Sequence, residues 1–122
     1  MKLNNECKKE NKVINACIQV NISRESNKSG CMPEALLNLV SDVNSLSRLR
    51  LRGLMIIPEA VKTRKNLAAP FENIRRLFDL CRDFETELDT LSMGMSDDFE
   101  LAIEHGSTMV RLGTVLFGSR NR

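Results

Sequence analysis

Residues 90–118 read TLSMGMSDDFELAIEHGSTMVRLGTVLFG. Two β-prone runs, TLSMGMS and TMVRLG, flank one short helical segment, and each run ends near glycine and a hydroxylated residue. Ser96 is typical of a helix N-cap, with two aspartates in the first turn and Gly106 just past the helix end. The stretch therefore predicts a β-α-β unit with a strand end on either side of the helix.

Outward from this unit, strands and helices continue to alternate. Residues 16–23 and 49–57 are predicted strands, and 108–113 is the strand that closes the quoted unit. Helices are expected from Pro33 to near Leu46 and over 70–88, and a final helical turn over 114–120. Residues 1–12 are interpreted as a frayed helix end or a loop, and 59–68 as a mobile loop. The order predicts an α/β fold with parallel pairing, which fits a doubly wound sheet or half of an eight-stranded barrel equally well.

Composition narrows the classes of function. The 122 residues are enough for one domain, spanning 1–122, and the net charge of +2 does not indicate a nucleic-acid or membrane partner. The basic cluster Arg48, Arg50 and Arg52 lacks interleaved aromatic residues and is interpreted as a solvated rim. Four irregularly spaced cysteines and a single histidine argue against a metal site and for reduced thiols in the cytoplasm.

The strand ends are the candidate site. In α/β folds ligands bind at the carboxyl ends of the strands, where backbone N–H groups at helix starts favour an anion. The third and fourth strands end in Gly94-Met95-Ser96 and Gly113-Thr114, so a phosphate site is one interpretation. The alternative is that Ser96 and Thr114 are helix caps and nothing more. Asp97 and Asp98 oppose an anion unless they turn to solvent.

Arg111 is the second candidate. A period of two along the fourth strand puts Met109, Arg111 and Gly113 on one face, and Val110 and Leu112 on the other. An inward guanidinium cannot lose its proton, so it needs a carboxylate, a ring nitrogen or an anionic ligand as a partner. A position at the solvent rim is the alternative. His105 is expected to be a surface residue at a helix C-terminus, and no hydrolytic triad or nucleotide-binding glycine motif is present.

These residues carry a family resemblance. SMGMSDDFELAIEHGSTMVRLGTVLFG resembles the C-terminal signature of the pyridoxal-phosphate homeostasis proteins, the YggS/PROSC family, which are relatives of the alanine racemase N-terminal barrel. RLRGLMIIP and IQVNISRESNKSG resemble that family's sixth strand and its fifth strand with the following loop. The match starts near Leu3 and reaches the C-terminus.

The resemblance implies strands five to eight of a (β/α)8 barrel that binds pyridoxal 5'-phosphate at its C-terminal face. By position, Ser96, Gly113 and Thr114 would hold the phosphate, Arg111 would approach the pyridine nitrogen, and Met55 would line the ring. The family is thought to bind and deliver the cofactor without a reaction of its own. We therefore expect a non-enzymatic protein of pyridoxal-phosphate homeostasis, with PLP-dependent enzymes as recipients.

The sequence departs from the family in length. Members are roughly twice as long, and their Schiff-base lysine lies on the first strand, for which this sequence has no counterpart. We therefore expect noncovalent cofactor binding, and self-association or pairing with a missing N-terminal half. The alternatives are a remnant or interaction fragment that binds no cofactor, and an amino-acid racemase. The absence of tyrosine and of a matching lysine argues against the racemase.

Overall fold

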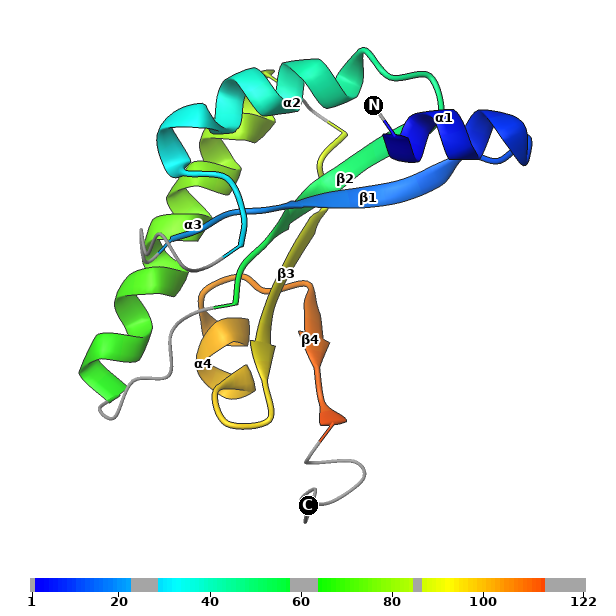
Figure 1. Cartoon of the computed structure of the whole chain (residues 1–122). Helices are drawn as coiled ribbons and strands as arrows, with labels where there is room; N and C mark the ends of the chain where they lie inside the picture. Colours follow the sequence, from blue (N-terminus) through cyan, green and yellow to red (C-terminus); the bar gives the residue numbers. More distant parts are fainter. Residues whose placement is uncertain (1, 23–28, 58–63, 85–86, 114–122) are drawn as a thin grey trace.

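The computed structural model describes residues 2–22, 29–57, 64–84 and 87–113. The order of elements is α1 (Lys2–Lys9), β1 (Ile14–Gln19), the short 3-10 helix η1 (Pro33–Ala35), α2 (Leu36–Asn44), β2 (Leu49–Met55), α3 (Arg64–Phe84), β3 (Thr90–Met95), α4 (Phe99–Glu104) and β4 (Met109–Arg111). Figure 1 shows these elements along the chain. The alternation of strands and helices expected from the sequence is confirmed.

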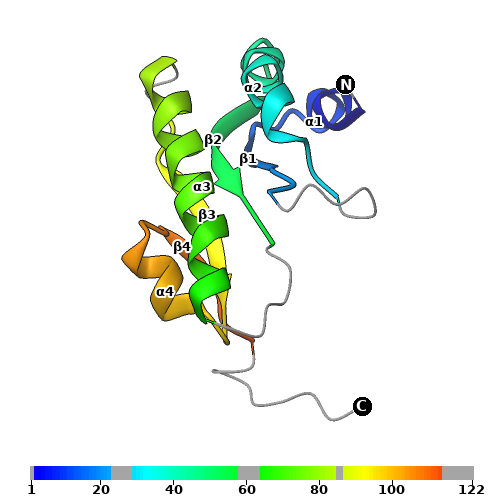
Figure 2. The same ribbon diagram turned by 90° about the vertical axis from the view of Figure 1, so that its left-hand side faces the viewer.

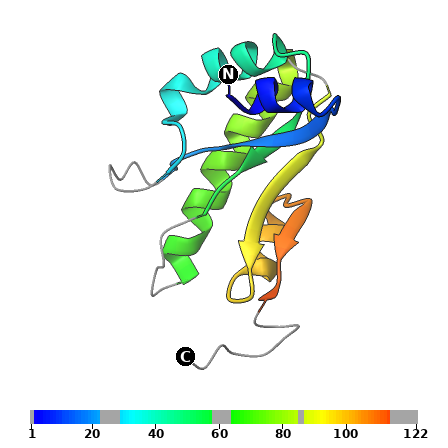
Figure 3. The ribbon, with the colours of Figure 1, turned by 45° about the vertical axis from the view of Figure 1, so that its right-hand side comes forward.

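The four strands form one parallel sheet in the order β1-β2-β3-β4. Helix α2 contacts β2, whereas α3 and α4 contact β3. Figure 2 is viewed from the helical side, and Figure 3 brings the strands forward, with α3 behind them. Sequential strand order with these helices on one face is the arrangement of a barrel segment, because a doubly wound sheet reverses its strand order and carries helices on both faces.

The core lies between the sheet and these helices. The amphipathic stripe predicted on the long helix is buried: Phe71, Ile74 and Cys81 are 0% exposed and Phe78 is 4% exposed. The stripe packs against strand residues such as Leu54, Leu91 and Met93, each 0% exposed. Burial of this kind stabilises the fold by about 1.5–3 kcal/mol per large apolar side chain.

Gly53 sets the spacing between β2 and β3. A Cβ atom at this position would lie 1.6 Å from the carbonyl oxygen of Thr90, so no side chain fits. The register between β1 and β2 also shifts at this position: Ala16 pairs with Leu51, whereas the next residue, Cys17, pairs with Gly53. The close approach of two backbones therefore explains glycine in the middle of a buried strand.

Several expectations about element boundaries were wrong. Residues 64–68, which the sequence analysis placed in a mobile loop, belong to α3, with Pro70 inside the helix. Of the two interpretations of residues 1–12, the helical one is confirmed: residues 2–9 form helix α1, on which Asn4 accepts a hydrogen bond from the Arg48 backbone N–H at 2.8 Å. Strand β1 begins and ends earlier than the predicted 16–23.

Helix α4 starts later than expected. Ser96 is not its N-cap: the N-cap is Asp98, whose side chain makes no capping bond, and the helix begins at Phe99. The predicted helical turn at 114–120 lies outside the described residues, as does most of the loop expected after the first predicted strand. Within the described residues, no helix combines the length and apolar character needed to cross a membrane.

Candidate functional site

The carboxyl ends of β2, β3 and β4 lie at one end of the sheet. Met55 closes β2 and is level with Ser92 on β3, and Met95, which closes β3, is level with Arg111 on β4. The predicted site residues Met55, Ser96, Arg111 and Gly113 are thus at or just beyond neighbouring strand ends. Thr114, the fifth predicted site residue, lies outside the described residues.

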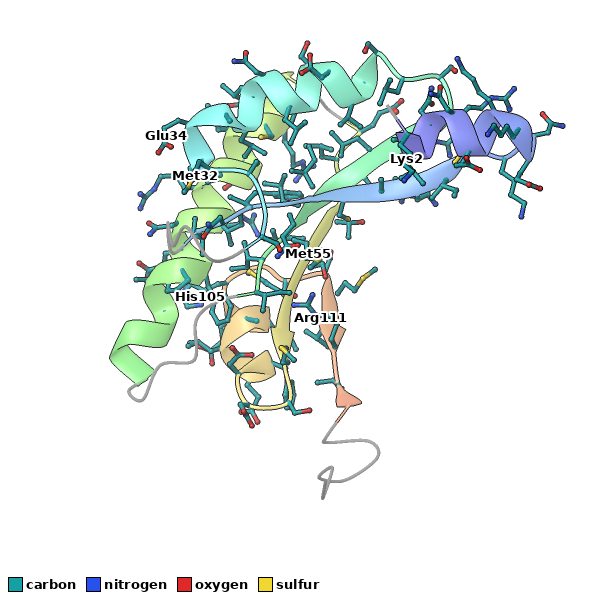
Figure 4. All side chains as sticks on the ribbon, viewed as in Figure 1. Lys2, Met32, Glu34, Met55, His105 and Arg111 are labelled. Carbon is teal, nitrogen blue, oxygen red and sulfur yellow. The ribbon has the colours of Figure 1, made fainter. Side chains whose placement is uncertain are left out.

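Arg111 reaches across the sheet. Its Nη2 donates a hydrogen bond of 3.0 Å to the backbone carbonyl of Ile56, the residue after β2, although β3 lies between β2 and β4. Figure 4 shows the Arg111 and Met55 side chains on this part of the sheet. The guanidinium group is thereby fixed beside the end of β2.

Arg111 also carries an unsatisfied donor. Its Nε atom is buried and has no hydrogen-bond partner among the described residues. A buried donor without an acceptor costs about 1–3 kcal/mol, and the guanidinium cannot remove this cost by losing a proton. An acceptor that the described residues do not provide would remove this cost.

The alternation predicted for β4 holds. A Cβ atom on Gly94 would approach Val110 Cγ1 at 3.2 Å and Ala102 Cβ at 2.7 Å, so Val110 lies on the side of the sheet that α4 covers. Arg111, one residue further along the strand, therefore lies on the open face. The same contacts show that Gly94, with φ of +103°, allows α4 to pack against β3.

The end of β3 is less open to an anion than the sequence suggested. The backbone N–H of Met95 donates to Asp98 Oδ1 at 2.7 Å, and the Asp98 N–H donates to the Met95 carbonyl at 3.1 Å. One amide expected for the phosphate is thus already paired with a carboxylate. Ser96 is half-buried and has interactions of its own within the protein. The sequence analysis missed this turn, for which Asp98 directly before a helical run was the available signal.

Just beyond β4, at Gly113, the described residues leave space. Gly113 is exposed, and a Cβ atom placed there would meet no described atom within 4 Å. Because α4 has six residues and begins three residues after Ser96, its dipole adds little at the end of β3. Among the described residues, Gly113 and the Nε of Arg111 are therefore the parts of the candidate site that other protein groups do not already occupy.

The basic cluster near the amino end of β2 is more than a solvated rim. Arg50 is exposed, but Arg48 Nη1 donates to Asn11 Oδ1 at 3.3 Å, and Arg52 forms a two-pronged ion pair with Asp89. Hydrogen bonds from Arg52 and Thr90 hold the pKa of Asp89 below its usual range.

A second concave region lies between α3 and α4, with a volume of about 540 Å³. Its lining carries both charges: Glu72, Arg75, Arg76, Asp79, Ile103, Glu104, His105 and Gly106. Arg75 pairs with Asp79, and His105 Nε2 lies 3.6 Å from Glu72 Oε1. His105 follows α4 as the sequence predicted, although its side chain is 22% exposed and packs near Phe71. This region is formed by the helices and is separate from the strand ends.

A parallel sheet in sequential order, with helices on one face, defines the chain as part of a (β/α)8 barrel. The family comparison agrees. The family model described as alanine racemase, N-terminal domain, matches residues 1–121, and the chain belongs to this family.

Three similar proteins place the chain within the family. The pyridoxal phosphate homeostasis protein of Pseudomonas aeruginosa is 53% identical over 88% of this chain and 46% of its own length. The structure of PipY from Synechococcus elongatus with PLP bound has a TM-score of 0.83 and 28% identity, over 96% of this chain and 55% of that one. Alanine racemase from Clostridium difficile, with a TM-score of 0.72 and 17% identity over 99% of this chain and 34% of that one, shares the fold. The chain spans about half the length of the curated relatives it matches.

The residues present fit pyridoxal phosphate in part. The unsatisfied Nε of Arg111 suits an acceptor such as a ring nitrogen, and the open surroundings of Gly113 leave room for a phosphate. The Met95 amide does not contribute, because Asp98 already accepts its hydrogen bond. The fit of the site to pyridoxal phosphate therefore depends on Gly113 and on Arg111, whose guanidinium is held by the backbone carbonyl of Ile56.

Proposed function

We propose that this chain binds pyridoxal phosphate noncovalently, as the phosphate-holding half of a homeostasis protein without catalytic activity. The observation that carries the proposal is the buried, unsatisfied Nε of Arg111 beside the end of β2. Ser96, Gly113 and Thr114 hold the phosphate in this proposal, and Met55 lines the ring.

Arg111 explains why the site suits a carrier. When bound, pyridoxal phosphate supplies an electron-withdrawing ring that is most effective with its nitrogen protonated. A guanidinium remains a donor at all physiological pH values, so the nitrogen beside it stays an unprotonated acceptor. This weakens the ring as an electron sink and favours storage and delivery to PLP-dependent enzymes.

Noncovalent binding is supported by where the described lysine side chains lie; those of Lys28, Lys62 and Lys65 are outside the described part of the protein. The lysine side chains that the structure describes are on α1 and at Lys12, before β1, whereas the candidate site is beyond the opposite ends of the strands. Lys2 is labelled there in Figure 4. Without a covalent bond, a site with few contacts gives a Kd of roughly 1 μM to 1 mM, equivalent to about 4–8 kcal/mol. The four free thiols support placing the protein in the cytoplasm.

A remnant that binds no cofactor is the second candidate, favoured by the Met95–Asp98 hydrogen bond at the expected phosphate position. One measurement distinguishes the cofactor-binding protein from the remnant that binds no cofactor. A phosphorylated pyridine that lacks the aldehyde cannot react with lysines, so any binding of this probe is noncovalent binding at the candidate site. We expect about 5 mM of this probe to raise the Tm by several degrees, as expected from binding to the native state.

The variant Ser96→Asp/Thr114→Asp should abolish this rise, because two carboxylates repel the phosphate. The matched control is Ser41→Asp/Ser47→Asp, which adds the same charge at exposed positions around α2. The control should keep the rise. No rise in the unmodified chain rules out the binding function and leaves the remnant.

A further inference from the structure

The pairing of β3 with β4 contains one extra residue on β3. Ser92 is level with Met109, and Met95 is level with Arg111, so three steps along β3 oppose two steps along β4. This arrangement is a β-bulge, in which two consecutive residues of one strand oppose a single residue of the other. Gly94 lies within the bulge with φ of +103°, a backbone conformation that residues with a side chain rarely adopt.

Both residues of the bulge face the helices. Gly94 does so because a Cβ atom on it would lie 2.7 Å from a side-chain atom of α4, and Met93 is fully buried in the core between the sheet and the helices. Ser92 and Met95, which flank the bulge, are level with residues on the opposite face of the sheet, the face that carries Arg111. That face therefore has no β3 side chain between Ser92 and Met95.

Arg111 crosses β3 at this stretch without side chains. Its Nη2 donates to the carbonyl of Ile56 at 3.0 Å, and Ile56 is the residue after Met55, which is level with Ser92. The acceptor is therefore about level with Met93, the first residue of the bulge. A regular strand would place every second side chain on this face, in the path of the guanidinium. The bulge thus leaves Arg111 room to reach Ile56.

Ser107 supplies the bulge with a hydrogen-bond donor. A bulge interrupts the ladder of backbone hydrogen bonds, so a carbonyl within it needs another donor. Ser107 Oγ donates to the carbonyl of Met93 at 2.6 Å and is also 3.0 Å from the carbonyl of Met109. A hydroxyl has one proton, and the shorter contact is the hydrogen bond that joins the loop before β4 to the bulge.

Thr108 fixes the start of β4 independently of Ser107. Its backbone N–H donates to the carbonyl of Leu91 at 3.0 Å, and its Oγ1 accepts from the Leu91 N–H at 2.7 Å. Loss of the Ser107 hydroxyl therefore removes the bond to the bulge and leaves the start of β4 attached to β3. A substitution at Ser107 tests the bulge without detaching the strand.

We propose that Ser107 is a positioning residue: its hydroxyl stabilises the β3 bulge, and the bulge holds the Arg111 guanidinium against the carbonyl of Ile56. Ser107 precedes β4 and Gly113 follows it, so Ser107 acts on the strand-end site only through the bulge. Without its hydroxyl, the buried Met93 carbonyl loses its donor, and relaxation of the bulge moves the guanidinium away from Ile56. The consequence for cofactor binding rests on the proposed function, whereas the position of Arg111 is measurable without a ligand.

The first arm of the test follows Arg111 in the ligand-free protein. NMR of arginine side-chain N–H groups measures the exchange of the Arg111 Nε–H with water, and Arg111→Lys assigns the signal. Ser107→Ala should make this exchange at least about tenfold faster, because a guanidinium that loses its acceptor samples the solvent. Ser107→Thr keeps the hydroxyl and should keep the slow exchange.

The matched control is Ser45→Ala. It removes a serine hydroxyl that donates to the Asp42 carbonyl at the same distance, 2.6 Å, at the end of α2. This variant should leave the exchange of the Arg111 Nε–H unchanged, so the control distinguishes a general loss of stability from a loss of positioning.

The second arm measures the affinity for the phosphorylated pyridine that lacks the aldehyde. Ser107→Ala should weaken binding at least about fivefold, whereas Ser107→Thr and Ser45→Ala should not. If the unmodified chain binds no probe, the proposed function fails, and the exchange measurement alone decides the role of Ser107. Unchanged Arg111 exchange in Ser107→Ala, equally fast exchange in either of the other two variants, or unchanged affinity in Ser107→Ala overturns the proposal.

Discussion

Arg111 shows how a single residue connects sequence to chemistry. The period of two in β4 predicted its face, and the structure confirms that Val110 lies on the α4 side of the same strand. Its partner, the carbonyl of Ile56, is 55 residues away in sequence, and no local pattern identifies such a contact. The hydrogen bond from the Met95 amide to Asp98 was also not predicted, because residue type alone makes Ser96 and Asp98 equally good N-cap candidates.

Gly53 provides a test of close packing at the residue scale. Gly53→Ala places a methyl group against the Thr90 carbonyl, so we expect a loss of about 3 kcal/mol or more in the free energy of unfolding. Gly113→Ala, where no described atom lies within 4 Å, should change it by less than about 0.5 kcal/mol. Urea denaturation followed by circular dichroism measures both, and equal stability of the two variants contradicts the account of Gly53.

The Arg52–Asp89 pair predicts a pH dependence. Because the pKa of Asp89 is lowered in the folded protein, the carboxylate stabilises the fold above its unfolded pKa of about 3.9. This contribution is lost as the pH falls through the lower, folded pKa. Arg52→Gln should raise the pKa of Asp89 in a carbon-detected NMR titration, whereas Arg50→Gln, at an exposed neighbour, should leave it unchanged. An unshifted Asp89 in the Arg52 variant rejects the pairing.

At the scale of elements, the sequence predicted where helices and strands occur better than where they begin. Strand β2 and the buried stripe of α3 follow directly from hydrophobic period. The predicted start of α3 was wrong because the predicted helix began at Pro70, whereas the helix runs from Arg64 through Pro70. Local propensity marks proline as a boundary, and the longer helix overrides it.

Pro70 therefore gives a prediction about α3. Inside a helix, proline removes one backbone hydrogen bond and crowds the preceding turn, at a cost of about 3 kcal/mol. Pro70→Ala should stabilise the protein by about 1–3 kcal/mol and slow amide exchange in residues 64–74. Pro33→Ala, at the start of η1, is the control and should stabilise little. Unchanged exchange near Pro70 contradicts a continuous helix.

At the scale of the whole molecule, the order of elements left two architectures open, because doubly wound sheets and barrels share the same β-α alternation. What separates them is the side on which each helix packs, a property of tertiary contacts such as those of Phe71 and Ile74 with the sheet.

The most direct measurement for the central claim is the affinity for a phosphorylated pyridine and for its unphosphorylated counterpart, by titration calorimetry. Strand ends that hold a phosphate beside Arg111 predict a Kd between about 1 μM and 1 mM for the phosphorylated compound. The unphosphorylated compound should bind at least about tenfold more weakly, a difference of about 1.4 kcal/mol or more. Equal affinities, or no heat of binding up to about 10 mM of either compound, would contradict a phosphate site at these strand ends.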